Sequence, residues 1–393
     1  MKIVHVITRL IVGGAQENTL LSCEGQHALC HDVTLIIGPQ TGPGGSLLDR
    51  ARAAGLNVEI DNNLVRELAP IKDGLARRSL LKRFRRLQPD VIHTHSSKAG
   101  IVGRSAAWKL NAGRQPPLVV HTIHGLAFTT STRWLVNKLY VLAEKLAAKQ
   151  CHKIACVATA MADQSLAFGI GRAEQYETVF SGMDIGPFLH PPVDRQSMRR
   201  QLGLAESDIA VVTIARLFEK KGHDDLLAAA PRLCRELPNL KFVWIGDGNL
   251  RDSFEQRIAE MKLQDRFILT GLVPPTDVPQ LVNACDILAH PSRREGLARA
   301  LPQGQLAGLP VVTYDIDGNA EGLLEGKSGY AVPPFEAAVF VNRIRELAMD
   351  KGLRTEFGQT GRAFASHRFD TQTMVDALES LYERGLAELR SQR

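Results

Sequence analysis

The sequence has no long hydrophobic run, and this bears on where the protein works. No uninterrupted apolar stretch approaches the roughly 20 residues that a bilayer-spanning helix needs. The first residues, MKIVHVITRLIVGGAQ, break their apolar run at Arg9, which makes the run too short for a signal peptide. We therefore expect a cytoplasmic protein without a membrane-spanning helix.

Cysteine is sparse, and its spacing shows no pairing. No Cys-x-x-Cys motif occurs among the six cysteines, so the sequence predicts neither a disulfide framework nor a zinc site. We expect reduced thiols that are mostly packed in the interior. They are Cys23, Cys30, Cys151, Cys156, Cys234 and Cys285.

Two familiar nucleotide-binding motifs are incomplete. Gly13 and Gly14 follow the first apolar run, but they do not extend to Gly-x-Gly-x-x-Gly, and no complete P-loop occurs. Dinucleotide-binding and P-loop functions are therefore disfavoured. A glycine turn before a helix can still offer N–H groups to phosphate or sugar, although tight strand-to-helix turns also use glycine for purely steric reasons.

Positive charge is in excess in this chain of 393 residues, which is long enough for two or three domains. The net charge of +6 favours a polyanionic partner, which nucleic acid, anionic lipid and a phosphorylated small molecule would all satisfy. The segment ARRSLLKRFRRLQPD sets cations around leucine and phenylalanine at helical spacing, which predicts either a solvated helix face or a face that meets membrane. The cations are Arg77, Arg78, Lys82, Arg83, Arg85 and Arg86.

Short β-rich runs alternate with longer amphipathic segments along the whole chain. This alternation predicts an α/β protein with parallel sheets covered on both faces. Two series of runs predict two doubly wound, Rossmann-like domains facing a central cleft, with ligands at the carboxyl ends of the strands. The join is predicted in FSGMDIGPFLHPPVD. The runs are KIVHVIT, DVTLIIG, DVIHTH, LVVHTIHG, KIACVAT and YETVFSG, then AVVTIARL, KFVWIGDG, RFILTGLV, DILAHPS, LPVVTYD and SGYAVPP.

Histidines gather where two predicted strands end. His93 and His95, two residues apart, would share one face of a sheet. We interpret His93 and His121 as structural residues, whereas His124 directly precedes Gly125 at a strand end and is the better candidate for the ligand cleft. No acidic or cysteine ligand lies close by in the sequence, so we do not expect a metal site.

The second half carries cations and glycine turns at predicted strand ends. Arg216 ends one strand, and Lys221 follows five residues later, before a glycine and a helix. Together they could clamp a diphosphate, and the alternative is a pair of ordinary solvated loop cations. WIGDGNLRDSF adds a further glycine turn, with Gly246 and Gly248 on either side of an aspartate.

Taken in order, these motifs resemble those of the retaining, nucleotide-sugar-dependent glycosyltransferases of family 4, which have the GT-B fold. The resemblance covers nearly the whole chain, and its last motif is the most specific. In that fold the C-terminal helix returns to the first domain, which implies domains of 1–182 plus 372–393 and of 183–371. The motifs are GGAQ, DVIHTHSSKAG, HTIHG, FSGMDIGPF, ARLFEKKG, IGDG, FILTGLVP and PSRREGLARALPQGQLAGLPVV.

The resemblance implies roles residue by residue. Arg216 and Lys221 would bind the donor diphosphate, and Glu295 would lie near the transferred sugar as the first acid of a Glu-x7-Glu motif. Gln303 stands where the second acid commonly binds the ribose, and an amide keeps an acceptor there but loses the charge. His124 would approach the donor sugar and the acceptor. The other implied donor contacts are Gly13, Gly14, Gly246, Ile268, Leu269, Gly296 and the amides of Leu297 and Ala298.

The implied activity is transfer of a hexose-type sugar from a nucleoside diphosphate, with UDP favoured over GDP. The acceptor would be lipid-linked or polysaccharide, in cell-envelope glycan synthesis. Departure of the diphosphate develops negative charge that cations and a helix dipole stabilise, so neither a metal nor a cofactor is expected. Nucleic acid is not an expected partner, and contact of the cationic segment with the inner face of the plasma membrane stays open. The alternatives are a nucleotide-sugar epimerase of the same fold and a non-catalytic homologue.

Two further segments carry expectations. RFDTQTMVDALESLYERGLAELRSQR predicts an amphipathic helix whose last turns are weakened by Gly385. Phe128 and Trp134 lie in a segment expected to bind the acceptor, where they would stack on sugar or touch lipid, although interior packing is favoured for both. The apolar side of the predicted helix is formed by Val375, Leu378, Tyr382, Leu386 and Leu389.

Overall fold

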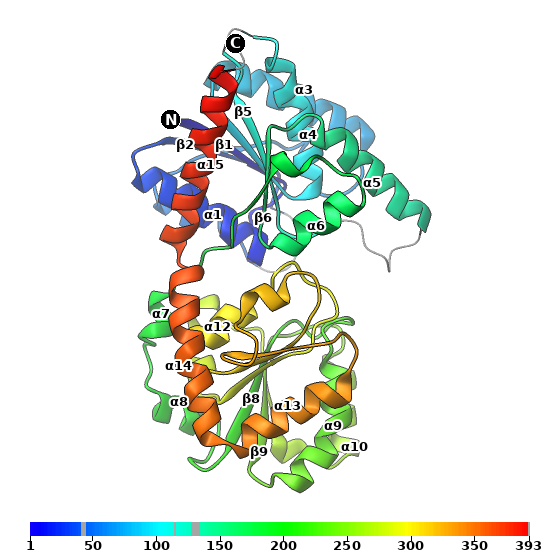
Figure 1. Cartoon of the computed structure of the whole chain (residues 1–393), viewed down its shortest axis with the longest axis vertical. Helices are drawn as coiled ribbons and strands as arrows, with labels where there is room; N and C mark the ends of the chain where they lie inside the picture. The colour runs from blue at the N-terminus through cyan, green and yellow to red at the C-terminus, as the bar shows by residue number, and fades with distance from the viewer. Residues whose placement is uncertain (41–44, 114, 127–133, 392–393) are drawn as a thin grey trace. The chain divides into compact units, whose positions relative to one another are not determined.

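The computed structural model describes residues 1–40, 45–113, 115–126 and 134–391. It divides into two compact units, which Figure 1 shows with the chain coloured from end to end. Unit 1 comprises Met1–Met183 and Thr371–Arg393, and unit 2 comprises Asp184–Asp370. Each junction differs by one residue from the boundary predicted from the sequence. Among the described helices, none combines the length and the apolarity needed to cross a membrane.

Unit 1 is built on a parallel sheet whose central strands are buried on both faces. Within the described residues its order is β3-β2-β1-β4-β5-β6-β7. Burial on both faces explains why these strands appear in the sequence as nearly continuous Val, Ile and Leu runs instead of alternating patterns. The strands are β1 Lys2–Ile7, β2 Asp32–Ile37, β3 Asn57–Ile60, β4 Val91–His95, β5 Leu118–Ile123, β6 Lys153–Cys156 and β7 Tyr176–Thr178.

The helices of unit 1 cover this sheet, and one strand was missed by the sequence reasoning. β3 is a short strand at the edge of the sheet, and none of its residues is fully buried. Its sequence, NVEI, therefore carries too weak an apolar signal to be recognised. The helices are α1 Gly14–Ala28, α2 Leu48–Ala53, α3 Pro70–Leu87, α4 Ser97–Ala107, α5 Trp134–Ala148, α6 Thr159–Ala167 and α15 Thr371–Ser391.

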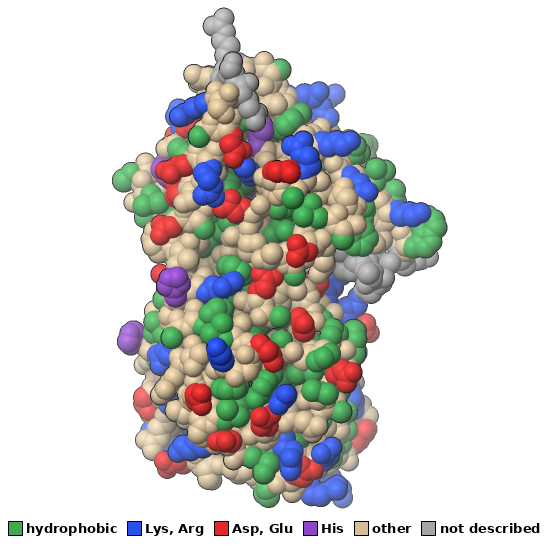
Figure 2. Space-filling view, viewed as in Figure 1, with side chains coloured by type: hydrophobic (Ala, Val, Ile, Leu, Met, Phe, Trp, Pro, Cys, Tyr) green, Lys and Arg blue, Asp and Glu red, His purple; other side chains and the backbone are tan. Residues whose placement is uncertain are grey.

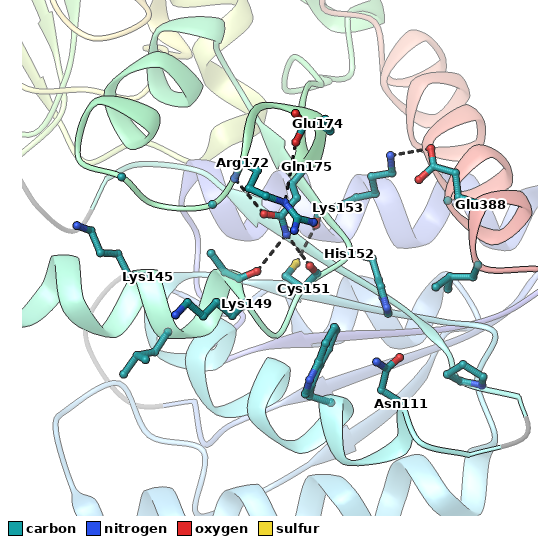
Figure 3. Close-up of a pocket in the computed structure, with 18 of the residues that line it drawn as sticks. Asn111, Lys145, Lys149, Cys151, His152, Lys153, Arg172, Glu174, Gln175 and Glu388 are labelled. Atoms are coloured by element: carbon teal, nitrogen blue, oxygen red, sulfur yellow. Dashed lines mark hydrogen bonds and ion pairs between the residues drawn. The ribbon is translucent and has the colours of Figure 1, made fainter. Parts of the chain in front are cut away.

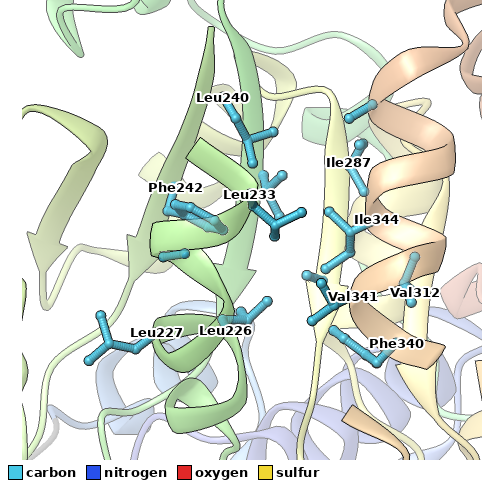
Figure 4. Packing of buried hydrophobic residues seen from close by; sticks show 14 of the residues in the cluster. Leu226, Leu227, Leu233, Leu240, Phe242, Ile287, Val312, Phe340, Val341 and Ile344 are labelled. Atoms are coloured by element: carbon cyan, nitrogen blue, oxygen red, sulfur yellow. The ribbon is translucent and has the colours of Figure 1, made fainter. Parts of the chain in front are cut away.

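Unit 2 repeats the same architecture around a second parallel sheet, ordered β10-β9-β8-β11-β12-β13 among the described residues. Successive residues of a strand face opposite sides, so Val211 and Val212 of β8 belong to different hydrophobic clusters. Figure 4 shows side chains of α9 and α13 lying over one face. The strands are β8 Ile209–Ile214, β9 Leu240–Ile245, β10 Phe267–Gly271, β11 Ile287–His290, β12 Val311–Tyr314 and β13 Gly329–Val332.

The helices of unit 2 include the two that matter for its site, α9 and α12. Each of these follows a strand and begins at the carboxyl edge of the sheet. The helices are α7 Gly186–Leu189, α8 Arg195–Gln201, α9 His223–Glu236, α10 Arg251–Glu260, α11 Val278–Asn283, α12 Ala300–Leu306, α13 Ala337–Met349 and α14 Lys351–Arg368. Single 3₁₀ turns span Trp108–Leu110 and Ala173–Gln175 in unit 1, and Gln264–Arg266, Pro275–Asp277 and Asn319–Gly322 in unit 2.

The C-terminal helix, α15, packs on unit 1 along the apolar side predicted from the sequence. Val375, Leu378 and Tyr382 are buried there. Gly385 does not end the helix, which continues to Ser391. A Cβ atom at Gly385 would lie 2.7 Å from Leu118 Cδ1, so glycine allows α15 to approach β5 closely.

This close approach predicts the effect of a side chain at Gly385. Gly385→Ala should lower the free energy of unfolding by about 1–3 kcal/mol, because the added methyl group overpacks against Leu118 in the core. Gly74→Ala in α3 is the matched control. A Cβ at Gly74 meets no atom within 4 Å, so this change should raise stability by up to about 1 kcal/mol. Urea unfolding measures both, and equal effects of the two changes would contradict the packing argument.

Candidate functional site

The loops that follow β8 and β11 in unit 2 bring three polar side chains together. Lys221 Nζ lies 2.5 Å from Glu295 Oε1, and His290 Nε2 lies 3.1 Å from the same oxygen. Lys221 and Glu295 were both predicted site residues, but their pairing was not predicted. His290, the last residue of β11, was missed, although a histidine at a predicted strand end was a usable signal.

A close backbone approach holds these two loops together. Gly222 has a φ of 75°, and a Cβ atom there would lie 1.9 Å from the carbonyl oxygen of Pro291. Glycine alone tolerates both conditions. The amide of Arg293 also donates to the carbonyl of Lys220 over 2.7 Å. The loop that carries Lys221 is therefore fixed against the loop after β11.

A third loop, which follows β12, fixes the backbone around Glu295. The amide of Glu295 donates to Asp317 Oδ2 over 2.9 Å. The amide of Gly318 donates to the carbonyl of Gly296 over 2.7 Å. Three loops from adjacent strands thus converge on one carboxylate at the carboxyl edge of the sheet, which is where an open parallel sheet binds ligands.

The charge of that carboxylate is set by opposing effects. Burial alone would raise the pKa of Glu295, but the hydrogen bond and the electrostatic interaction with His290, followed by the charge and the hydrogen bond of Lys221, outweigh it. Together they lower the pKa to about 2. Glu295 is therefore an anion at neutral pH and a poor general acid.

The amides before α12 were predicted to meet phosphate, and one of them is already occupied. Ala298 is buried, and its N–H donates to Asn319 Oδ1 over 3.1 Å. A phosphate at Ala298 would have to displace this hydrogen bond, and the role of Ala298 stays a prediction. Leu297 is half-buried on the same loop and stays a candidate.

Arg216 extends from the same loop as Lys221 and is exposed. Its guanidinium lies 5.0 Å from the ring of Phe218, and within the described part of the chain no carboxylate pairs with it. The glycine turn after β9 lies beside it, since a Cβ on Gly246, whose φ is 142°, would be 2.2 Å from the Ala215 carbonyl oxygen. An arginine that no acid neutralises is suited to bind phosphate oxygens.

The remaining candidates for donor binding in unit 2 include residues of β10 and α12, outside the loops that meet at Glu295. Ile268 and Leu269 are partly buried neighbours in β10, at the edge of the sheet, and they pack with different hydrophobic clusters. Because they face opposite sides, a base stacked on this strand can contact one of them but not both. Gln303 is half-buried on α12. Among the residues described, no hydrogen bond joins its side chain to Glu295.

In unit 1, histidines form a hydrogen-bonded chain inside the sheet. His5 Nδ1 lies 2.9 Å from His95 Nε2, and His95 Nδ1 lies 3.1 Å from His124 Nε2. His5 Nε2 lies 2.7 Å from Gln26 Oε1. His5, in β1, was missed by the sequence reasoning. Burial lowers the pKa of His5 to about 4 and that of His95 well below its usual value, so the buried members of the chain are neutral.

The structural interpretation of His93 and His121 is confirmed by their contacts. His93 bonds to the Tyr382 hydroxyl through Nδ1 and to Thr122 Oγ1 through Nε2, while His121 Nδ1 bonds to Thr94. His93 and His95 share a sheet face, as predicted, with ring centroids 4.3 Å apart.

The argument from the sequence against a metal site did not consider His5, which adds a third imidazole beside His93 and His95. Ring nitrogens of His5, His93 and His95 lie within 4.8 Å of one another, close enough to hold one ion. Each of the six ring nitrogens of these histidines already has a hydrogen-bond partner. A metal ion would have to displace these bonds in a fully buried place, so the donor set fits a metal poorly.

Gly13 and Gly14 lie at the start of α1, as predicted for a helix that follows β1. The steric explanation for the pair does not hold at Gly13. Its φ of 169° is extended backbone that any residue can adopt, and a Cβ there would meet only the end of the flexible Gln16 side chain. Gly14 is exposed at the first helical position.

The cationic segment of unit 1 forms the outer side of α3. Its apolar side is not available to a membrane, because Leu80 and Phe84 are buried in the core of unit 1. Arg83 and Arg86 both pair with Glu59 of β3. The solvated helix face, one of the two alternatives for this segment, therefore describes it better.

Two family profiles match consecutive parts of the chain. The one described as Glycosyltransferase Family 4 matches residues 12–186, and the one described as Glycosyl transferases group 1 matches residues 194–364. The chain belongs to the group 1, family 4 glycosyltransferases. The two profiles meet near the junction of the two units, so each domain of this glycosyltransferase carries its own part of the family pattern.

Known proteins resemble this glycosyltransferase over nearly its whole length. The UDP-Gal:alpha-D-GlcNAc-diphosphoundecaprenol alpha-1,3-galactosyltransferase of Escherichia coli is 27% identical over 386 residues, 97% of this chain and 96% of its own. The capsular polysaccharide biosynthesis glycosyltransferase CapM of Staphylococcus aureus is 22% identical over 343 residues, 85% of this chain and 89% of its own.

Solved structures agree on the fold. The crystal structure of Anabaena Alr3699/HepE in complex with UDP superposes with a TM-score of 0.81 and 23% identity, covering 98% of this chain and 100% of that chain. The structure of WaaG, a glycosyltransferase involved in lipopolysaccharide biosynthesis, gives a TM-score of 0.72 at 17% identity, covering 97% of this chain and 99% of that one. Two parallel-sheet, Rossmann-like domains of the GT-B type are therefore the fold of this glycosyltransferase.

The low pKa of Glu295 predicts how the free energy of unfolding depends on pH. Its carboxylate stabilises the folded state fully above about pH 4.5, its ordinary pKa, and that contribution is lost as the pH falls toward 2. Glu295→Gln should lower the free energy of unfolding by about 2 kcal/mol at pH 7, and the difference from wild type should shrink below pH 5. Urea unfolding at several pH values measures it.

The control for this prediction is Glu356→Gln, which removes an exposed carboxylate from α14. This variant should follow the wild type across the same pH range. A Glu295→Gln deficit that stays constant between pH 7 and pH 3 would contradict the assignment of the charge to Glu295.

Proposed function

We propose that this protein is a retaining, metal-independent glycosyltransferase that moves a hexose-type sugar from a nucleoside diphosphate to a lipid-linked acceptor in cell-envelope glycan synthesis. UDP is the favoured nucleotide, with GDP as the alternative. The observation that carries the proposal is the group of Lys221, Glu295 and His290 beside the exposed Arg216, at the carboxyl edge of a parallel sheet.

Arg216 and Lys221 are the proposed diphosphate ligands. Breaking the bond between sugar and phosphate leaves negative charge on the diphosphate, and two cations in the loop between β8 and α9 would stabilise that charge most strongly in the transition state. Lys221 pairs with Glu295 before the donor binds. The diphosphate then offers Lys221 a second anionic partner on the same side of the loop.

Glu295 is proposed as a partner of the sugar hydroxyls and of the positive charge that develops on the ring. Its pKa of about 2 keeps it ionised at neutral pH, which suits this role and argues against proton donation to the leaving group. For retention we propose departure and attack on the same face of the sugar, with the leaving diphosphate oxygen accepting the proton of the acceptor hydroxyl.

The other predicted positions complete the proposed donor site. The base would lie on β10 against either Ile268 or Leu269, with Gly246 and Gly296 allowing close approach. Gln303 would bind a ribose hydroxyl through its amide oxygen. In unit 1, His124, Gly13 and Gly14 stay the proposed contacts for sugar and acceptor.

The nature of the donor and acceptor is inferred from the relatives. The E. coli protein is named for a UDP-galactose donor and a diphosphoundecaprenol-linked acceptor, and the S. aureus protein is named for capsular polysaccharide biosynthesis. The Anabaena structure is described with UDP. These names support a UDP-sugar and a polyprenyl-linked acceptor for this chain.

Nucleotide binding is the first test of this function. UDP should raise the melting temperature more than GDP or ADP does. Arg216→Gln should bind UDP about tenfold or more weakly, because a charged hydrogen bond to phosphate is worth about 1.5–3 kcal/mol. The matched control is Arg232→Gln, which removes an exposed arginine of α9 and should bind UDP as the wild type does.

The reaction itself provides the second half of that test. Incubation with UDP-sugars and a diphospholipid-linked sugar should give a glycosidic product whose anomeric configuration matches the donor, with activity retained in EDTA. No stabilisation by any nucleotide, or epimerised donor without a glycosidic product, would overturn the proposed function. Activity that requires an added divalent cation would overturn its metal independence.

Gln303 makes a separate prediction. If its amide binds a ribose hydroxyl, Gln303→Glu should bind UDP about fivefold to thirtyfold more tightly, which corresponds to the roughly 1–2 kcal/mol gained by a charged acceptor. Isothermal titration of UDP against both proteins measures the ratio. Weaker binding by Gln303→Glu would contradict the ribose assignment. It would mean that the side chain lies near enough to the diphosphate for charge repulsion to outweigh any hydrogen bond to a ribose hydroxyl.

A further inference from the structure

The outer side of α5 carries an uninterrupted stripe of exposed leucines. Leu135 and Leu139 are each 67% exposed, and Leu142 and Leu146 are each 55% exposed. Their spacing of four, three and four residues places them on one side of the helix. Trp134, expected to pack in the interior, is instead 62% exposed at the start of the same helix, whereas Phe128 lies outside the described residues.

The charges along this stripe are all positive. Lys138 lies over the Trp134 ring, with its Nζ 4.1 Å from the ring centroid. Lys145 follows beside the leucines, and Lys149 comes just after the end of the helix. The one acidic residue of α5, Glu144, is buried and pairs with Arg104 at 2.7 Å. The exposed side of α5 is therefore apolar and cationic, with no carboxylate of its own.

A hollow of about 1180 Å³ adjoins the stripe and shares residues with it. Leu142 and Leu146 line the hollow together with Lys145 and Lys149. Figure 3 shows these lysines around the hollow, with Lys153 bonded to Glu388 at 2.8 Å. In the part of the chain that the structure describes, no carboxylate pairs with Lys145 or Lys149. The hollow thus adds unneutralised cations at one end of the leucine stripe.

We propose that α5 is a membrane-docking helix that lies in the surface of a bilayer containing anionic lipids. The leucine stripe and Trp134 would enter the boundary between headgroups and acyl chains, and the lysines would meet the lipid phosphates. Figure 2 shows hydrophobic and basic side chains together at the outer edge of unit 1, where Figure 1 places α5. This surface replaces the α3 cations as the membrane contact.

Charge decides between a membrane and a second copy of this chain. Two copies joined through α5 would bring the lysines of both faces together. The two acids that line the hollow, Glu174 and Glu388, already pair with Arg172 and Lys153. An anionic lipid surface supplies the missing negative charge and also the apolar environment for the leucines. The docking gives the enzyme access to the lipid-linked acceptor, and in that respect it rests on the proposed function.

Vesicle binding of the full chain, without donor or acceptor, tests the docking separately from the reaction. The wild type should bind vesicles of phosphatidylglycerol and phosphatidylethanolamine, and bind phosphatidylcholine vesicles far more weakly. Leu139→Gln with Leu142→Gln should weaken binding at least about tenfold, because two large apolar side chains no longer enter the bilayer. Lys145→Gln with Lys149→Gln should weaken it about fivefold for each lysine.

Two controls match these changes elsewhere on the surface. Leu272→Gln in unit 2 removes a leucine that is 74% exposed, and Arg77→Gln with Arg78→Gln removes two exposed cations from α3. Both should bind vesicles within about twofold of the wild type. Lys145 is half-buried and the other altered side chains are exposed, and none of them belongs to the core, so each variant should unfold at the wild-type temperature.

Three outcomes would overturn the docking surface. The first is a wild-type protein that binds no anionic vesicle, and the second is equal vesicle binding by the α5 variants and the wild type. The third is a dimer in solution that the double leucine change dissociates while vesicle binding is absent, which would assign the stripe to a second copy. None of these outcomes affects nucleotide binding or transfer to a water-soluble acceptor, so the proposed function would stand.

Discussion

Burial of parallel strands on both faces is the constraint from which the rest of the structure follows. Helices cover each sheet, so an unpaired charge within a strand would be cut off from water and strongly destabilising. In unit 2 the charged side chains of Lys221 and Glu295 therefore lie on loops past the strand ends, where they meet His290, the last residue of β11. In unit 1 histidines do occur inside the sheet, and they are tolerated because they are neutral and their ring nitrogens are hydrogen-bonded.

The strand ends become a site because backbone contacts between loops bring the right side chains together. Gly222 permits the loop after β8 to touch Pro291 after β11, and Asp317 after β12 holds the amide of Glu295. The low pKa of Glu295 is a consequence of that convergence, since burial alone would act in the opposite direction. A site organised in this way offers fixed charge before any ligand arrives, which is the condition for stabilising charge that develops during a reaction.

Helices α3 and α5 of unit 1 show that an apolar pattern does not reveal which side of a helix is exposed. In α3 the leucines at the centre of the basic segment are core residues, and its cations are solvated or paired with Glu59. In α5 the leucines point outward while small residues and Glu144 face the core. Both segments have the same apolar periodicity, but the pattern does not state which side the sheet will cover.

Local sequence patterns were enough to predict the alternating architecture, twelve of the thirteen described strands, the terminal helix, and Arg216 and Lys221 after a strand end, because buried strands and glycine turns leave local patterns. Glu295 was identified through the resemblance to the family. Other features became visible only in the folded structure. They are the edge strand β3, the partners His5 and His290, the pairing of Lys221 with Glu295, and the hydrogen bond from the Ala298 amide to Asn319. These features depend on contacts between residues far apart in the chain, and no local pattern records which distant residues the fold will place within hydrogen-bond distance.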